Sequence, residues 1–305
     1  MAMLRTESVQ VKVPATCANL GPGFDTLGLA LQTYDSLRAM ASADAGVLVE
    51  VEGEGVVDVP RDASNLVVRA MALGFTAMNV RPSGFVLRCT NVIPHGRGLG
   101  SSAAAIIGGL ALARAMVVDG DLLMPNEVLL QVALELESHP DNLAAALYGG
   151  FTNAWLEGDG AQSVRHDVHA SVIPITAVPA FQVPTSAARS ALAPMVSRED
   201  ASFNISRAAL LVHALTSNPA LLFAATEDRL HQDARRSVYP DSMHLVDALR
   251  AQGLPAVISG AGPTVLVFGS AGDVERVKAA AGERWQVTEQ VVARQGVHVS
   301  PTLPL

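Results

Sequence analysis

The sequence predicts a protein of mixed helices and strands arranged in two halves, and three observations support this. Segments in which apolar and polar residues alternate, as in strands, are interspersed with segments whose apolar residues recur at helical spacing. The chain has 305 residues, which is enough for two domains. The acidic, glycine-containing stretch from Glu157 to Gly160 is typical of a surface turn. We therefore place two domains at residues 1–160 and 161–305.

In the first half, strands and helices are indicated by different features. Residues 9–13 alternate as a strand does, and Asn65 can cap the first turn of a helix that continues to Met78. Alanine-rich sequence after Ser101 favours a further helix. The expected strands are residues 9–13, 28–41, 46–57, 84–93 and 151–156, and the expected helices are residues 65–78, 102–118, 125–137 and 140–147.

The second half shows the same mixture. Short apolar runs predict strands, and longer amphipathic segments predict helices. These patterns do not give the order of strands in a sheet. The expected strands are residues 173–181, 256–259 and 264–268, and the expected helices are residues 206–216, 221–225, 243–252 and 273–281.

The most informative segment runs from Pro94 to Ala105 and reads PHGRGLGSSAAA. Its three alternating glycines allow tight turns and let a ligand approach the backbone closely. Two serines follow and begin the alanine-rich helix, and unpaired N–H groups at a helix N-terminus attract anions. A nucleotide is therefore the first candidate ligand. The segment lacks the lysine of a Walker loop and does not match the dinucleotide fingerprint. The alternative is a plain turn before a buried helix.

Composition excludes several classes of partner. The net charge of −8 argues against nucleic acid or an anionic membrane surface. Cys17 and Cys89 cannot form a disulfide framework and suit a reducing cytosol. The N-terminus has no apolar stretch of signal-peptide length, and the apolar run 103–118 is too short to span a membrane and contains Arg114. We expect a cytoplasmic protein that binds neither nucleic acid nor membrane, and no zinc site, because His and Cys lack zinc-ligand spacing.

Two further glycine-containing loops stand out. Residues 14–25 read PATCANLGPGFD and follow the first strand; Asn19 offers a donor and an acceptor, and Asp25 offers an anion. Residues 258–264 read ISGAGPT and lie between two apolar strands. Taken alone, the first loop can also be explained as a plain turn, and the second is better explained as a tight hairpin connection.

Taken together and in this order, the three segments resemble those of the GHMP kinases, the group of galacto-, homoserine, mevalonate and phosphomevalonate kinases. Within this group, residues 16–28 are similar to the homoserine kinases. The likeness continues through residues 137–142 (ESHPDN), 185–189 (TSAAR) and 230–235 (LHQDAR), so it covers nearly the whole chain.

The resemblance implies an α+β fold with two domains. The N-terminal domain would be of the ribosomal-S5-domain-2 type and would hold the nucleotide loop. The C-terminal domain would be ferredoxin-like, and its turn at residues 259–264 would lie against that loop. Members of the group are often homodimers, so a homodimer is the expected assembly.

The resemblance also implies a reaction, namely ATP-dependent phosphorylation of the side-chain hydroxyl of L-homoserine on the way to threonine. Mg²⁺ would be held by Ser102 and Glu137, with Ser101 as the alternative hydroxyl, and oxygen ligands are those that Mg²⁺ prefers. The implied ATP-binding residues are Pro94, His95, Gly96, Arg97, Gly98, Leu99, Gly100, Ser101, Ser102, Ala103, Ala104, Gly260 and Gly262.

The implied substrate is a small zwitterion. Guanidinium groups bind carboxylates bidentately, and by the resemblance Arg189 and Arg235 hold the α-carboxylate. Asp25 would face the α-ammonium group. Asn19 would contact the reacting hydroxyl. The implied substrate-binding residues are Asn19, Asp25, His139, Thr185, Arg189 and Arg235, and the implied catalytic residues are Asn19, Glu137 and Asp141.

The role of Asp141 is left open. An aspartate here could act as a general base, whereas homoserine kinases are thought to manage without one, and a loose transition state requires little of a base. Two other functions are also considered: phosphorylation of another small alcohol, such as mevalonate or a sugar, and non-catalytic nucleotide binding. Arg189, Arg235 and Asp25 together favour an amino acid, because it offers both charges to match.

Overall fold

The computed structural model describes residues 3–158 and 160–301, and within these residues the strands form one seven-stranded and one four-stranded sheet. The larger sheet has the order β11-β1-β2-β4-β3, and the β5–β6 hairpin joins it at β2. Its pairings are antiparallel except for the parallel pair β3–β4. The strands are β1 (Val9–Ala18), β2 (Leu27–Ser42), β3 (Gly46–Gly53), β4 (Gly84–Asn91), β5 (Phe151–Glu157), β6 (Gly160–His166) and β11 (His298–Ser300).

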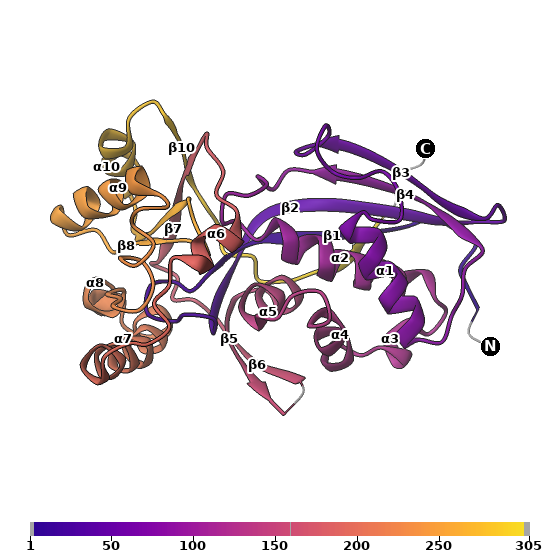
Figure 1. The fold of residues 1–305 in the computed structure, drawn as a ribbon, viewed down its shortest axis with the longest axis horizontal. Helices are drawn as coiled ribbons and strands as arrows, with labels where there is room; N and C mark the ends of the chain where they lie inside the picture. The colour runs from indigo at the N-terminus through magenta and orange to yellow at the C-terminus, as the bar shows by residue number, and fades with distance from the viewer. Residues whose placement is uncertain (1–2, 159, 302–305) are drawn as a thin grey trace.

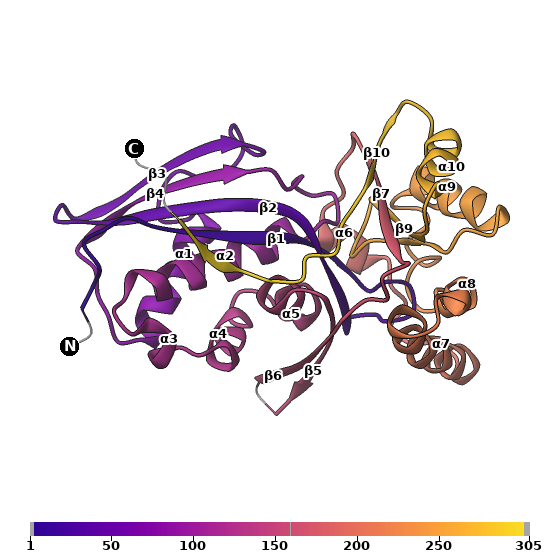
Figure 2. The ribbon, with the colours of Figure 1, turned by 180° about the vertical axis from the view of Figure 1, so that it is seen from behind.

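Five helices lie on one face of this sheet (Figures 1 and 2). The α2 helix is buried on nearly all sides between the sheet and α1, and it contacts α1 very closely at Gly109, where a Cβ atom would lie 2.6 Å from the Val67 carbonyl oxygen. Asn65 caps α1 as predicted, accepting a hydrogen bond from the Val67 N–H at 2.9 Å. The helices are α1 (Leu66–Ala77), α2 (Ser101–Met116), α3 (Gly120–Leu123), α4 (Asn126–Ala133) and α5 (Pro140–Tyr148).

The second lobe contains the smaller, antiparallel sheet, in the order β10-β7-β9-β8, and it has a hydrophobic core of its own. The short helix α6 lies where the two lobes meet (Figure 1). The elements are β7 (Ile173–Pro179), α6 (Thr185–Ser190), α7 (Arg198–Thr216), η1 (Pro219–Leu221), α8 (Leu222–Ala225), α9 (Pro240–Ala251), β8 (Ala256–Ile258), β9 (Val265–Gly269), α10 (Asp273–Ala281) and β10 (Trp285–Glu289).

The predicted α+β class is confirmed, and every predicted strand and helix overlaps an observed one. Five elements of the described chain were not predicted: β6, α3, α6, β10 and β11. These elements are short or half-exposed, so their own apolar pattern is weak. The strands among them are held in place by pairing with other strands. For example, Val299 of β11 pairs with Val11 at the far end of the chain.

The predicted boundary at residue 160 falls inside the β5–β6 hairpin, and β11 returns to the larger sheet. The division of the chain into two folding units at residues 160/161 therefore stays a prediction. Asp159, within the predicted turn, lies outside the described residues. Among the described helices we find none with the length and hydropathy needed to cross a membrane.

Candidate active site

The glycine-rich loop adopts the backbone conformation that its glycines predict. Gly96, Gly98 and Gly100 have φ values of 64°, 75° and 71°, which are strained for other residues. Gly100 is the N-cap of α2, and no side chain among the described residues caps this helix. The N–H groups of its first turn therefore point out of the helix end without partners there, as an anion site requires.

Close packing against other segments is a second reason for glycine. A Cβ atom on Gly100 would lie 1.9 Å from Thr16 Oγ1, and one on Gly98 would lie 2.4 Å from the Ser259 carbonyl oxygen. Thr16 Oγ1 donates a hydrogen bond to Asn142 Oδ1 at 2.7 Å. The loop is thus held between β1 and the start of α5.

The turn at residues 259–264 of the second lobe lies against the same loop. Ser259 Oγ donates to the Gly98 carbonyl at 2.6 Å, and the Thr264 N–H donates to the Arg97 carbonyl at 3.2 Å. The Gly260 N–H also bonds the Ala18 carbonyl, at the end of β1. The contact expected between these two remote glycine-rich segments is therefore present, and it joins the lobes at the loop.

The loop after β1 is unusual in its backbone. Asn19, Leu20 and Asp25 have φ values of 65°, 51° and 56°, a region that costs non-glycine residues about 1–2 kcal/mol each. Asn19 offsets part of this cost, because its Nδ2 donates to the Gly260 carbonyl at 2.8 Å and its Oδ1 accepts from the Asp25 N–H at 2.9 Å. A second hydrogen on Nδ2 and a second lone pair on Oδ1 remain for a ligand.

Arg189 and Asp25 form a bidentate ion pair, with N···O distances of 2.7 and 3.2 Å. Arg235 is only 1% exposed, and its Nε donates to the Ala188 carbonyl at 2.9 Å. Both guanidinium groups lie near the ring of Phe24, at 5.7 and 5.4 Å from its centroid. Two cations and one anion from distant parts of the chain thus share one small space.

Glu137 and His139 form a second pair. His139 Nδ1 lies 2.9 Å from Glu137 Oε1, and this hydrogen bond lowers the pKa of Glu137 and raises the pKa of His139. The carboxyl group of Asp141, in the first turn of α5, is buried, and burial raises its pKa to about 6. Glu137 and Asp141 therefore line the space in front of the glycine-rich loop with pKa values that are shifted in opposite directions.

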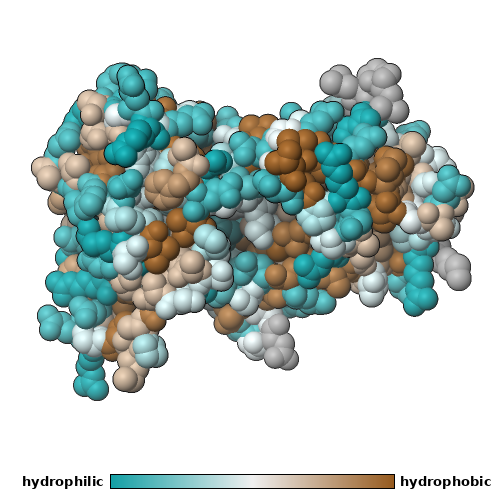
Figure 3. Space-filling view, turned by 45° about the horizontal axis from the view of Figure 1, so that its top comes forward, coloured by the Kyte–Doolittle hydropathy of each residue, from teal (hydrophilic) through white to brown (hydrophobic). Residues whose placement is uncertain are grey.

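These groups line one cavity of about 120 Å³ between the lobes. The molecular surface is recessed where the lobes meet (Figure 3). The cavity brings together sixteen of the predicted site residues, which are Asn19, Asp25, Gly96, Gly98, Gly100, Ser101, Ser102, Ala103, Glu137, His139, Asp141, Thr185, Arg189, Arg235, Gly260 and Gly262.

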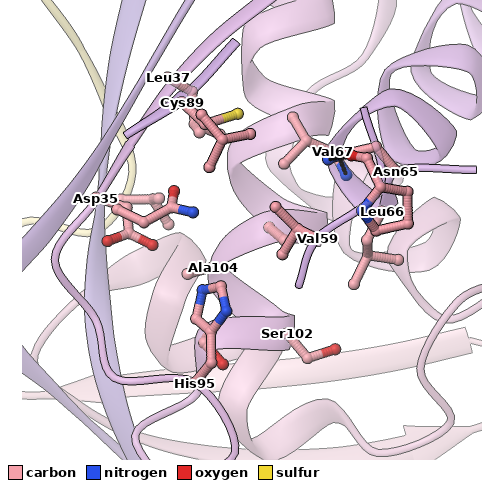
Figure 4. A pocket seen from close by; sticks show the side chains of 16 residues that line it. Asp35, Leu37, Val59, Asn65, Leu66, Val67, Cys89, His95, Ser102 and Ala104 are labelled. Carbon is pink, nitrogen blue, oxygen red and sulfur yellow. Dashed lines mark hydrogen bonds between the residues drawn. The ribbon is translucent and has the colours of Figure 1, made fainter. Parts of the chain in front are cut away.

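A second cavity of about 260 Å³ adjoins the first, because Ser101 and Ser102 line both. Figure 4 shows it between the strand residues Asp35, Leu37 and Cys89 on one side and the start of α1 on the other. The predicted residues His95 and Ala104 line this cavity and not the first. Its walls are mostly apolar, with Asp35, Asn65, Asn91 and His95 as polar groups.

Three predicted ATP-binding residues, Pro94, Arg97 and Leu99, line neither cavity in the described part of the chain. Leu99 is 5% exposed and belongs to the hydrophobic core. The Arg97 guanidinium turns away to the Ala180 carbonyl, at 3.1 Å, and to Glu54. The backbone atoms of Arg97 and Leu99 accept hydrogen bonds instead, so they shape the loop.

Comparison with known proteins shows the family of this chain. The family model for the GHMP kinase N-terminal domain matches residues 65–150. A homoserine kinase of Streptomyces avermitilis is 47% identical over 97% of this chain and 97% of its own length. The chain belongs to the homoserine kinase family. A crystal structure of homoserine kinase from Cytophaga hutchinsonii has a TM-score of 0.84 at 26% identity, covering 98% of this chain and all of that one.

Membership of the homoserine kinase family is more specific than membership of the fold. The structure of a mevalonate kinase from L. major in complex with R-mevalonate has a TM-score of 0.71 over 96% of this chain and 98% of its own, but only 13% of its residues are identical. That likeness shows the fold alone. The homoserine kinase relatives are therefore the ones that bear on the chemistry of the site.

Sequence reasoning missed the residues that hold the site in place. Thr16 and Asn142 support the glycine-rich loop, and Asp35 and Asn65 line the second cavity. The first two lie in segments already singled out as motifs, and a hydroxyl or amide inside a buried motif was the available signal. The sequence around Asp35 does not indicate a role in the site, because the N–H groups that donate to its carboxylate belong to Val92 and Ile93, which directly follow β4.

Proposed function

We propose that this cleft transfers the γ-phosphoryl group of ATP directly to the side-chain hydroxyl of L-homoserine, giving O-phospho-L-homoserine for threonine biosynthesis. The observation that carries the proposal is that the first cavity combines an uncapped helix N-terminus with two guanidinium groups and a carboxylate. The helix end suits a phosphate, and the opposite charges suit both ends of an amino acid.

ATP is divided between the two cavities. The amides from Gly98 to Ser102 face the phosphates, and the nucleoside occupies the second cavity, whose mostly apolar walls suit a purine ring. Ser101 and Ser102 stand at the junction. Helix α2 adds the favourable end of its dipole at the same point.

The donor set at this junction fits Mg²⁺. Ser102 and Glu137 line the same cavity, and one hydroxyl with one carboxylate is a normal protein contribution to Mg²⁺, which otherwise takes phosphate oxygens and water. In the described residues no group of three or more His, Cys, Asp or Glu side chains is arranged to hold a metal alone. Bound Mg²⁺ would neutralise charge on the phosphates. Glu137 is well prepared for this, because its lowered pKa keeps it ionised.

The amino acid occupies the space in front of Asn19. Arg235 and Arg189 bind the α-carboxylate, Asp25 receives the α-ammonium group, and the substrate thereby exchanges with the internal Asp25–Arg189 pair. His139 and Thr185 close the pocket, and the free donor and acceptor of Asn19 orient the hydroxyl toward the γ-phosphorus. Positioning of this kind supplies most of the catalysis in phosphoryl transfer.

The attacking hydroxyl must lose its proton, and Asp141 is the buried carboxylate available. Its pKa of about 6 leaves it mostly ionised at neutral pH. We propose that positioning by Asn19 dominates, that the hydroxyl proton passes to an oxygen of the phosphoryl group being transferred as ADP leaves, and that Asp141 is not an essential base. The proposal also includes a cytoplasmic homodimer without nucleic-acid or membrane partners.

A coupled ADP-release assay with L-homoserine, mevalonate and galactose tests this function. Of the three candidate acceptors, we expect only L-homoserine to be turned over, and this turnover should require added Mg²⁺. Turnover with mevalonate or galactose in its place would refute the substrate assignment. ATP binding with no turnover of any of the three would instead support a nucleotide-binding protein.

A further inference from the structure

One buried side chain next to the substrate arginines has no part in the function described above. His231 is 1% exposed, and its ring stacks on Phe24 with centroids 5.1 Å apart. Its Nε2 lies 2.8 Å from the Gly21 carbonyl oxygen, and its Nδ1 lies 3.2 Å from a terminal nitrogen of Arg235. A fully buried histidine with a partner on each ring nitrogen is held in one orientation.

These two partners determine the tautomer of the ring. A carbonyl oxygen only accepts hydrogen bonds, so Nε2 must carry the proton and donate to Gly21. In the neutral ring Nδ1 then has a free lone pair. The guanidinium of Arg235 only donates, so this lone pair is the acceptor it needs. Both hydrogen bonds are satisfied in one protonation state.

The surroundings favour that neutral state. Burial lowers the pKa of His231, and the Arg235 cation beside it acts in the same direction. Asp228 lies 3.8 Å from Nε2, and Asp25 faces the ring from the loop after β1, so both oppose the shift. Asp228 is also occupied elsewhere, because it accepts from the backbone N–H groups of Leu230, His231 and Gln232.

We propose that His231 is a positioning residue for homoserine binding: its Nδ1 fixes the guanidinium of Arg235, while its Nε2 fixes the loop that carries Phe24 and Asp25. The inference rests on the proposed function, in which Arg235 binds the α-carboxylate. Arg235 is also anchored through its Nε, which donates to the Ala188 carbonyl, and the Tyr239 side chain lies beside it. Two anchors on different nitrogens fix the plane of the guanidinium, which bidentate binding of a carboxylate requires.

Two conservative variants separate the two hydrogen bonds. The amide of asparagine reaches as far as Nδ1 of histidine, so His231→Asn keeps an acceptor for Arg235 and loses the bond to Gly21. The amide of glutamine reaches as far as Nε2, so His231→Gln keeps the bond to Gly21 and loses the acceptor. Each variant is the control for the other, because both remove the ring that stacks on Phe24.

The test is steady-state kinetics of the full chain with both substrates. For His231→Gln we expect the KM for L-homoserine to rise on the order of tenfold, as is typical for loss of a hydrogen bond to a charged group. The KM for ATP should change less than about twofold and kcat less than the KM for homoserine. His231→Asn should restore most of the homoserine affinity. Equal effects in both variants, or a parallel change in both KM values, would overturn the proposal.

Arg235→Ala separates this inference from the proposed function. If that variant leaves the KM for homoserine unchanged, Arg235 does not bind the substrate and the proposed site is wrong. If Arg235→Ala weakens homoserine binding and His231→Gln does not, only the inference about His231 fails. In the Arg235→Ala background, His231→Gln should add little, since the partner is already absent.

A measurement on the unaltered protein covers the case in which the variants fail to fold. Nitrogen-15 NMR of the labelled histidines reports which ring nitrogen carries the proton. We expect His231 to be neutral, with the proton on Nε2, at pH 7. A ring protonated on Nδ1 at that pH would contradict the geometry and refute the proposal.

Discussion

Gly100→Ala tests whether the glycine-rich loop depends on its fit against β1. Two separate costs are expected. Alanine at a φ of 71° costs about 1–2 kcal/mol of folding free energy. In addition, its Cβ would lie 1.9 Å from Thr16 Oγ1, closer than the 3.0 Å below which real Cβ contacts essentially do not occur.

That collision forces a movement of at least about 1 Å, since 3.0 − 1.9 = 1.1 Å. Either the loop shifts away from β1 or the Thr16 side chain rotates, and rotation breaks its 2.7 Å hydrogen bond to Asn142. Leaving buried polar groups without that bond costs a further 1–3 kcal/mol or so. The free energy of unfolding should therefore fall by about 2–5 kcal/mol. Because a 1 Å displacement of a catalytic site can cost about 10²-fold in rate, we expect kcat/KM for ATP to fall on that order.

Gly253→Ala is the matched control. Gly253 also has a positive φ, 79°, but no non-adjacent side-chain or backbone atom of the described residues lies within 4 Å of the added Cβ position. It should lose only about 1–2 kcal/mol and keep its activity. Urea unfolding and the coupled ADP-release assay measure both quantities. In the double variant Gly100→Ala/Thr16→Ala the costs should be less than additive, because the colliding hydroxyl is gone. Equal losses in the two single glycine variants, or strict additivity in the double variant, would refute the reasoning.

Four further predictions concern the carboxylates and the contact between lobes. Glu137→Gln should lower kcat by more than about tenfold and raise the Mg²⁺ concentration needed for half-maximal activity; an unchanged Mg²⁺ requirement would place the metal elsewhere. Asp141→Asn should lower kcat by less than about 10²-fold, and a larger loss would make Asp141 a true base. The pKa of Asp141 is about 6 in the folded protein and 3.8 for the free group, so its contribution to stability is full below pH 3.8 and is lost as pH rises through 6. Asp141→Asn should therefore be more stable than the wild-type protein at pH 7.5, by on the order of 3 kcal/mol at most, and should lose this advantage at pH 4. Unfolding measured at both pH values checks this. Ser259→Ala removes the 2.6 Å bond to the Gly98 carbonyl and should raise the KM for ATP several-fold while the KM for homoserine changes less; equal changes in both would argue for a general loss of structure.

Much of the site was predictable because its chemistry is local in the sequence. The alternating glycines from Gly96 to Gly100 fix a backbone that only glycine adopts easily, and the following alanines begin a helix at that point. The cap at Asn65 is likewise a contact between neighbours. Elements such as α6 were not predictable, because six residues with one buried side chain carry too little pattern.

The contacts that align the site are long-range, and their partners are invisible to a local pattern. His231 and Gly21 are 210 residues apart, and Ser259 and Gly98 are 161 apart. The ion pair between Arg189 and Asp25 was also not foreseen, since each was assigned to a separate end of the substrate. These partnerships arise only when burial removes water and the groups must satisfy one another.

The amino-acid sequence alone determined which groups are available to this protein: a helix start preceded by alternating glycines, two arginines, and the carboxylates of Asp25 and Glu137. Backbone conformation at glycine and the charge of a side chain are properties of the residues themselves, which is why they could be recognised in order along the chain. The tertiary structure alone decided how those groups are aimed. It buried Arg235 between two acceptors and formed a second cavity beside the first, because such arrangements depend on packing between segments that meet only in the folded chain.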